Sequence, residues 1–281
     1  MTIEVQSGTT HVNGQRPLAA AADAAVKATE GIGSFVTFTG QAIREIPVAI
    51  RLYPSEIMWQ AGHLVRDNAL VILFMLFMLG SVLGMTVDYL FSSIGIDSFI
   101  AAVASIGGMR GIAQVVFGWI IAAKVGCGIV AELGALRINE EIDALQVMGV
   151  RPVPYLASSR IVAAAVVLPL LFLVGMVVNF GAVYLVNVSL LNTVSPGGYE
   201  YFLFLFQNTR DLIIAVSWAT AVGMVIVAFA TYFGFTASGG PVGVGRNTAQ
   251  SMLVNLVLVS VLGMILIQLF YGNSPNSPIG N

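Results

Sequence analysis

The chain has 281 residues, of which 57% are hydrophobic and 9% are charged, and its mean hydropathy is +0.90. This composition is far more apolar than that of ordinary soluble domains, and it predicts a membrane protein. The formal net charge of -2 lacks the basic excess that nucleic-acid binding requires, so no nucleic acid is expected as a partner.

The N-terminal part of the chain is expected to lie on the cytoplasmic side. Residues 1–30 lack the basic segment followed by an apolar core that marks a secretory signal, and we expect them to be flexible and cytoplasmic. Residues 31–67 mix aromatic and apolar side chains with arginines, which is typical of an amphipathic helix in the membrane interface. A cytoplasmic helix packed on the spans is the alternative. Pro47 and Pro54 predict that this element is broken into pieces.

Five later stretches are long and apolar enough to cross a bilayer, which takes about 20 residues of helix. Their expected bounds are 68–87, 111–131, 161–186, 212–233 and 251–271. Before the second of them, residues 97–109 run into the sequence GGMRG, and we expect a broken, re-entrant or outer-surface helix there. The sequence therefore predicts an all-α membrane protein with about five transmembrane helices, one membrane domain at 68–271 and an outer tail at 272–281.

The distribution of basic residues indicates which ends of the spans face the cytoplasm. Lys and Arg gather before the first expected span and between the second and third, and Arg246 lies between the fourth and fifth. The segments 88–98 and 272–281 contain neither residue, and 187–211 contains only Arg210. By the positive-inside rule we expect a multi-pass protein with a cytoplasmic N-terminus and an outer C-terminus.

One stretch between the second and third spans concentrates charge in a chain that otherwise avoids it. Its charged members are Glu132, Arg137, Glu140, Glu141 and Asp143. On a single helix over residues 131–148 the charges would surround one apolar stripe. That stripe would consist of Ala135, Ile138, Ile142 and Leu145. Arg137 and Glu141 would be able to pair, and Gly149 would end the helix. Both a solvated loop helix and a docking surface for a basic groove on a soluble partner fit this pattern.

Two long motifs resemble those of a known family. The stretch AELGALRINEEIDALQVMGVRPVPYLASSR at 131–160 and the stretch ASGGPVGVGRNTAQSM at 237–252 are similar to sequences of the YrbE/MlaE permeases. These proteins are the membrane subunits of ABC-type lipid transporters that work with MCE proteins. The resemblance extends, with matching span spacing, from about residue 40 to the C-terminus.

The resemblance implies a function and a set of partners. Such a permease moves a hydrophobic substrate, such as a phospholipid, fatty acid or sterol, through a cavity between two permease subunits in a bacterial cell (inner) membrane. ATP and magnesium would bind to a separate cytoplasmic ABC ATPase, so this chain is expected to bind no cofactor and no metal. MCE-domain proteins would deliver or receive the lipid outside. The residues of both motifs are similar to those of the second permease in Mce-type pairs. This resemblance favours a paralogue over a second copy as the partner permease.

The resemblance also implies roles for particular residues. As a coupling helix that docks on the ATPase, the charged stretch would act through Glu132, Arg137, Glu140, Glu141 and Asp143. Many relatives carry an Arg-Glu pair followed by a proline at the start of the second span. Arg110 matches that arginine, whereas Gly111 and Gln114 replace the acid and the proline. Because an arginine near membrane depth is costly unless paired, hydrated or bound to an anion, we expect Arg110 to face a lipid cavity or to bind a structural partner such as Asp88 or Asp97.

The glycine-rich motif has the glycine spacing of a phosphate-binding P-loop, but Arg246 and Asn247 replace the lysine and the hydroxyl residue. ATP binding by this chain is therefore not expected. A tight cytoplasmic turn or close approach to a neighbour is the expected role of Gly239, Gly240, Gly243 and Gly245. No spacing of catalytic or metal-ligating side chains supports an enzyme. The aromatic residues at 201–208 are expected at the outer interface, where contact with lipid or an MCE protein is an alternative.

Two other classes of membrane protein are the alternatives to an ABC permease. A secondary transporter would place ionisable groups within its spans for coupling, and here the spans carry almost none apart from Arg110 and Lys124. A non-transporting membrane scaffold agrees with the composition but leaves both motifs unexplained.

Overall fold

The structure, a computed structural model, describes residues 31–272 of the chain. By the contacts among its residues the chain divides into two units, Met1–Gly40 and Gln41–Asn281. The described residues of the first unit, 31–40, are helical. The second unit contains all the elements discussed below. The expectations for residues 1–30 and for the tail beyond residue 272 lie outside the described residues.

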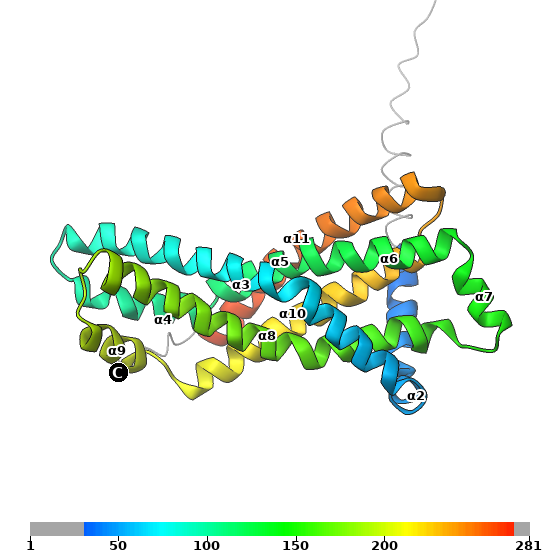
Figure 1. The fold of residues 1–281 in the computed structure, drawn as a ribbon, viewed down its shortest axis with the longest axis horizontal. Helices are drawn as coiled ribbons and strands as arrows, with labels where there is room; N and C mark the ends of the chain where they lie inside the picture. The colour runs from blue at the N-terminus through cyan, green and yellow to red at the C-terminus, as the bar shows by residue number, and fades with distance from the viewer. Residues whose placement is uncertain (1–30, 273–281) are drawn as a thin grey trace, which may run out of the picture. The chain divides into compact units, whose positions relative to one another are not determined.

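All regular elements in the described part of the second unit are helices, which confirms the predicted all-α class (Figure 1). In chain order they are α2 (Ile46–Leu52), α3 (Pro54–Ser92), the 3-10 turn η1 (Asp97–Phe99), α4 (Ile100–Met109), α5 (Ile112–Ile121), the π-helix η2 (Ala122–Gly126), α6 (Cys127–Ile138), α7 (Glu141–Val147), the π-helix η3 (Val153–Ser158), α8 (Ser159–Tyr184), the π-helix η4 (Leu185–Leu190), α9 (Pro196–Leu205), α10 (Thr209–Phe235) and α11 (Gly240–Tyr271).

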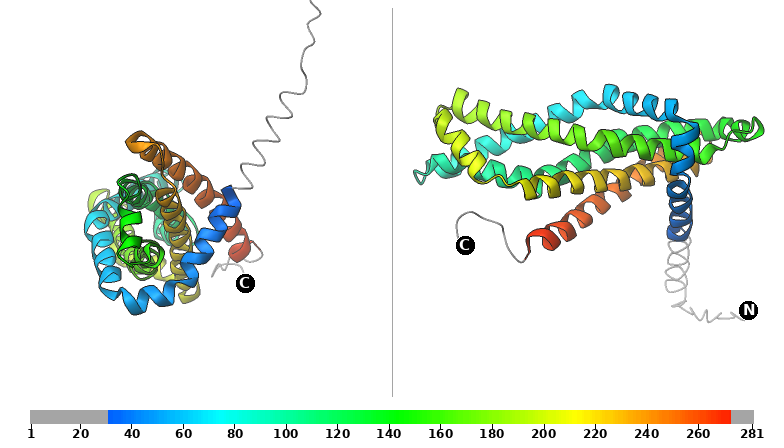
Figure 2. Two further views of the ribbon diagram at one scale, coloured as in Figure 1. Left: turned by 90° about the vertical axis from the view of Figure 1, so that its right-hand side faces the viewer. Right: turned by 90° about the horizontal axis from the view of Figure 1, so that it is seen from below.

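Among residues 31–272, five continuous helical runs are long and apolar enough to cross a membrane, as the sequence predicts. These runs are Pro54–Ser92, Ile112–Ile138, Val153–Leu190, Thr209–Phe235 and Gly240–Tyr271. The second run joins α5, η2 and α6, and the third joins η3, α8 and η4. The last helix, α11, crosses α5, α6 and α10 and diverges from the other long helices (Figure 2).

The helices extend beyond the apolar runs that mark them in the sequence. α3 begins at Pro54, so residue 67, the expected boundary between an interfacial helix and the first span, is not a helix end. Arg66 and Asp67 lie within α3, directly before its apolar part. The helix continues on both sides of them, because helical backbone hydrogen bonds form in water as well as in lipid. Pro47 and Pro54 both lie in the first turn of a helix, where a missing N–H leaves no hydrogen bond unmade.

The most extensive helix contact in the second unit is between α3 and α8, which lie side by side (Figure 1). A glycine allows the two backbones to approach closely, since a Cβ added at Gly80 would overlap the carbonyl oxygen of Asn179. The buried Asn179 amide donates a hydrogen bond of 3.0 Å to the carbonyl of Leu76. Close packing and interhelical hydrogen bonds hold helices together in lipid, where hydrophobic burial gives little advantage to helix pairing.

The segment before the second span forms a short helix that is buried within the second unit. α4 is too short to cross a membrane, and Ile100 and Ala101 on it are fully buried. The helix ends where the backbone bends at Gly111, which has a φ of 153°. The side-chain amide of Gln114 donates a hydrogen bond of 2.7 Å to the carbonyl of Met109 across this bend. Gln114 therefore satisfies a carbonyl at the end of α4.

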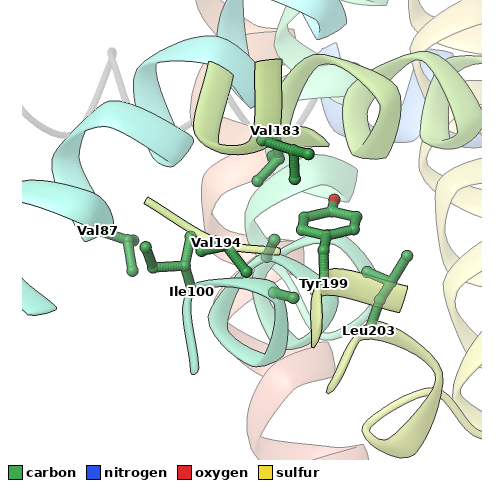
Figure 3. Packing of buried hydrophobic residues seen from close by; sticks show 9 residues of the cluster. Val87, Ile100, Val183, Val194, Tyr199 and Leu203 are labelled. Atoms are coloured by element: carbon green, nitrogen blue, oxygen red, sulfur yellow. The ribbon is translucent and has the colours of Figure 1, made fainter. Parts of the chain in front are cut away.

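A cluster of buried apolar side chains joins α4 and α9 to the ends of α3 and α8 (Figure 3). Its labelled members are Val87, Ile100, Val183, Val194, Tyr199 and Leu203. The Tyr199 hydroxyl donates a hydrogen bond of 2.8 Å to the carbonyl of Phe180, and burial raises the pKa of the Tyr199 phenol. These contacts hold α9 against the spans, at the end of the unit opposite to α7 (Figure 1).

We predict opposite effects for two glycine substitutions on α3. Gly80→Ala should destabilise the protein by about 1–3 kcal/mol, because the added methyl group meets the backbone of α8. Gly62→Ala, where a Cβ meets nothing within 4 Å, should stabilise the same helix by up to about 1 kcal/mol. Thermal unfolding of the purified protein in detergent measures both, and a lower melting temperature for Gly62→Ala than for Gly80→Ala would contradict the packing described.

Candidate functional site

A buried cluster of polar side chains joins the second, fourth and fifth spans. Arg110 Nε lies 2.9 Å from Asp211 Oδ2, and these side chains are 9% and 1% exposed. The hydroxyl of Tyr271 lies 3.4 Å from Asp211 Oδ1, and the Arg110 guanidinium lies 5.9 Å from the centre of the Tyr271 ring. The cluster therefore contains one cation, one anion and an aromatic ring that contacts both.

The local backbone explains how these three residues meet. Arg110 follows the last residue of α4, Asp211 lies in the first turn of α10, and Tyr271 ends α11. A carboxylate in the first turn of a helix is favoured by the unpaired N–H groups and by the helix dipole. Asp211 is thus stabilised both by Arg110 and by its own helix.

The expected structural partners of Arg110, Asp88 and Asp97, are wrong, because the carboxylate that binds it is Asp211. At Gly111, where the resemblance implies an acid, a side chain would be strained by the φ of 153°, and its Cβ would lie 2.9 Å from Ile267 Cδ1. The acid is instead supplied from another helix. Sequence reasoning missed Asp211 because it lies at the edge of the loop between the third and fourth spans. Its place at the start of a span was the available signal.

The charged stretch is not the single helix that its periodicity predicts. α6 ends at Ile138, Asn139 and Glu140 form a turn in which Glu140 has a φ of 60°, and α7 begins at Glu141. The chain therefore changes direction in the middle of the predicted apolar stripe. Gly149 follows α7 with a φ of 81°, in agreement with its expected role at the helix end.

This turn separates the candidate coupling residues into two groups. Glu132 and Arg137 lie on α6, within the second membrane-crossing run, whereas Glu141 and Asp143 lie on α7. Glu140 occupies the turn itself.

The ion pairs of the stretch also differ from expectation. Arg137 Nη1 binds Asp143 Oδ1 at 2.7 Å, so the predicted pairing of Arg137 with Glu141 is wrong. Glu132 Oε1 accepts a hydrogen bond of 2.6 Å from Nη2 of Arg160, a residue of α8 that is 3% exposed. Glu132 thus joins the second and third spans. Glu140 and Glu141 are both exposed; the Asn139 amide donates a hydrogen bond of 3.4 Å to Glu141 Oε1, and neither acid forms an ion pair among the described residues.

Two apolar residues that the sequence reasoning did not select end this segment. Val147 is 90% exposed and Met148 is 69% exposed. Together with Glu140 and Glu141, which are exposed at the start of the same helix, they form a set of exposed residues that we call the α7 tip. The signal for them was their position, directly before the helix-ending Gly149 and outside the apolar stripe.

The glycine-rich segment is a turn followed at once by a helix. Gly239 and Gly240 have φ values of 84° and 71°, and α11 begins at Gly240. A Cβ on Gly243 would overlap the carbonyl oxygen of Ser238, whereas one on Gly245 would meet nothing within 4 Å. Gly239, Gly240 and Gly243 thus make the tight turn, and Gly245 is one residue of α11. Among residues 31–272 no group of three or more metal-ligating side chains occurs.

Comparison with known proteins supports one family. The family model described as Permease MlaE matches residues 57–269. A probable ABC transporter permease protein of Rickettsia typhi is 29% identical over 246 residues, which cover 88% of this chain and 94% of the relative. A probable ABC transporter permease protein of Synechocystis is 25% identical over 186 residues, which cover 66% and 70%. The chloroplastic Arabidopsis thaliana protein TRIGALACTOSYLDIACYLGLYCEROL 1 is 24% identical over 191 residues, which cover 66% and 53%.

The Arg110–Asp211 pair predicts strongly non-additive effects of substitution. Arg110→Leu and Asp211→Leu should each destabilise the protein by about 3–5 kcal/mol, because each leaves an unpaired buried charge. The double variant should recover most of that loss. Arg210→Leu, which removes an exposed arginine next to Asp211, should have little effect. Melting temperatures in detergent test the cycle, and a double variant as unstable as the sum of the single variants would contradict it.

Proposed function

We propose a transport function for this chain, which belongs to the MlaE permease family. It is the membrane subunit of an ABC-type transporter that moves a hydrophobic lipid, and the energy comes from ATP hydrolysed by a separate cytoplasmic ATPase. The names of relatives from Rickettsia and Synechocystis, which describe probable ABC transporter permeases, support the ATPase partner. The name of the Arabidopsis relative is that of a glycolipid, which supports a lipid as the substrate.

The observation that carries the proposal is the α7 tip. α7 lies at one end of the second unit, on the connection between the second and third spans (Figure 1). Its exposed acids suit a basic groove, and the exposed Val147 and Met148 suit an apolar pocket at the centre of such a groove. Large apolar side chains beside charged ones in a turn outside the membrane are typical of a protein-binding surface. We therefore assign the α7 tip as the ATPase-docking surface.

The chain's own glycine-rich segment gives no support for ATP binding. In a P-loop the glycines follow a strand and present their N–H groups to phosphate, with a lysine and a hydroxyl residue beside them. Here the segment follows α10 and its glycines begin α11, while Arg246 and Asn247 stand at the critical positions. The Asn247 amide donates to the carbonyl of Phe233 at 3.0 Å. The segment closes the turn between two spans.

We assign the other two partners, an MCE-domain protein and a second permease, to exposed surfaces of α9 and α11. With the N-terminus in the cytoplasm of a bacterial cell and the C-terminus outside, α9 lies on the outer side. Its exposed Tyr201 and Phe204 provide an aromatic surface for an MCE-domain protein. The exposed apolar face of α11, which includes Leu253, Val257 and Met264, is assigned to a second permease. We favour a paralogue of this chain over a second copy as that permease.

We predict that charge reversal at the α7 tip uncouples the permease. In Glu140→Lys/Glu141→Lys, like charges would face the basic groove, so the ATPase that co-purifies with the chain from its native host should fall about tenfold or more. Lipid-dependent ATP hydrolysis by the purified complex should fall with it.

The matched control is Glu200→Lys, which reverses an exposed acid on α9 at the opposite end of the unit. That variant should retain the ATPase. Unchanged co-purification and unchanged ATP hydrolysis in the double variant, with the protein still folded in the membrane, would rule out the docking role.

A further inference from the structure

A polar cavity of about 260 Å³ opens between α3, the η2–α6 segment and α8. Apart from amide and apolar groups, its lining contains five charged or titratable residues. They are His63 and Asp67 of α3, Lys124 of η2, Glu132 of α6 and Arg160 of α8. No such concentration is expected among spans that are otherwise almost free of charge.

The cavity lies at the level where the apolar part of three helices ends. Asp67 is the last charged residue before the uncharged run of α3, and Arg160 is the last before the uncharged run from Ile161 to Tyr199. The apolar part of the second span, residues 111–131, ends before Glu132, which also lines the cavity, and Lys124 is the one charged residue within it. Because helices cross the hydrocarbon with such runs, the cavity lies at the depth of lipid headgroups.

Trp59 supports this depth. It is 56% exposed and stacks on His63, with ring centroids 5.1 Å apart. Exposed tryptophans of membrane proteins concentrate at the boundary between headgroups and hydrocarbon.

The acids of the cavity already have partners, whereas two of its cationic groups have spare donors. Glu132 binds Arg160, and Asp67 Oδ2 lies 3.1 Å from His63 Nδ1. Among residues 31–272 the Lys124 ammonium makes no hydrogen bond or ion pair. Arg160 Nε is buried and has no hydrogen-bond partner in the same part of the chain. A buried donor without an acceptor costs free energy, and Arg160 lines the cavity, so an anion bound there would lie beside a guanidinium whose hydrogen bonds are incomplete.

Phosphate is the anion that this arrangement suits. It offers several acceptor oxygens to donors that approach from different sides, and both arginine and lysine bind it through charge-assisted hydrogen bonds. Lys124 lies in a one-turn π-helix, a distortion that occurs mostly at functional sites.

We infer that this cavity binds the phosphate group of a phospholipid headgroup, through Lys124 and Arg160. The lipid enters from the bilayer leaflet at that depth, which is the cytoplasmic leaflet in the proposed orientation. Only that naming of the leaflet rests on the proposed function. The site is separate from the Arg110–Asp211 cluster, which lies at the other end of the second span.

Lipid titration of the purified full-length chain in detergent, followed by native mass spectrometry, tests the site. Dioleoyl phosphatidic acid should bind saturably, whereas dioleoylglycerol, which has the same acyl chains without phosphate, should not. Lys124→Gln should weaken phosphatidic acid binding about tenfold, which corresponds to the loss of one charge-assisted hydrogen bond. Lys124→Arg should keep most of the affinity, because it keeps the charge and the donors.

Arg66→Gln is the matched control, since it removes an exposed cation of α3 that does not line the cavity. It should leave phosphatidic acid binding unchanged. Equal binding of dioleoylglycerol, or equal losses in Arg66→Gln and Lys124→Gln, would overturn the inference. Inorganic phosphate that binds as tightly as phosphatidic acid would overturn the lipid source. The measurement uses neither ATPase nor nucleotide, so its failure is distinct from a failure of the docking role of the α7 tip.

Discussion

A charged side chain within a bilayer has no bulk water around it, and this constraint decides where the ion pairs of the spans lie. Arg110 binds Asp211 directly before the second span, and Glu132 binds Arg160 near the end of that span. The second span is therefore joined to α10 at one end and to α8 at the other. Its irregular backbone lies beside these pairs: Gly111 is buried, and Ala122, Val125 and Gly126 of η2 are buried while Lys124 lines the cavity.

The two ends of the second span differ in what they offer to partners. One end carries a buried pair with an aromatic neighbour, packed beside the cluster that holds α9. The other end carries the polar cavity and leads directly into α7. In the proposed transporter, a single helix thus connects the surface that meets the ATPase, the proposed headgroup site and the most deeply buried charge pair.

The sequence predicts the class of the fold and the number of spans because hydrocarbon demands long uncharged helices, and such runs are visible without a structure. It predicts helix ends poorly, as Pro54 and residue 67 illustrate, because a helix continues into water past its last apolar residue. Arg110 is identifiable as unusual from its depth alone, but its partner is not, since Asp211 is distant in the chain and sequence spacing is silent on contacts between spans. The periodicity of residues 131–148 fits one helix, yet the left-handed conformation of Glu140 interrupts it. A single residue in the left-handed conformation does not alter the hydrophobic periodicity of the sequence, so the pattern does not reveal it.

The shortness of the turn between α6 and α7 has a mechanical consequence. Only Asn139 and Glu140 separate the two helices. Across this turn Arg137 Nη1 forms a salt bridge of 2.7 Å with Asp143 Oδ1. A longer, glycine-rich connection would let α7 swing freely and would dissipate any push applied to it. In the proposed transporter, this short connection would pass a push from the ATPase on α7 to the second span, because it holds no flexible linker in which the motion is lost.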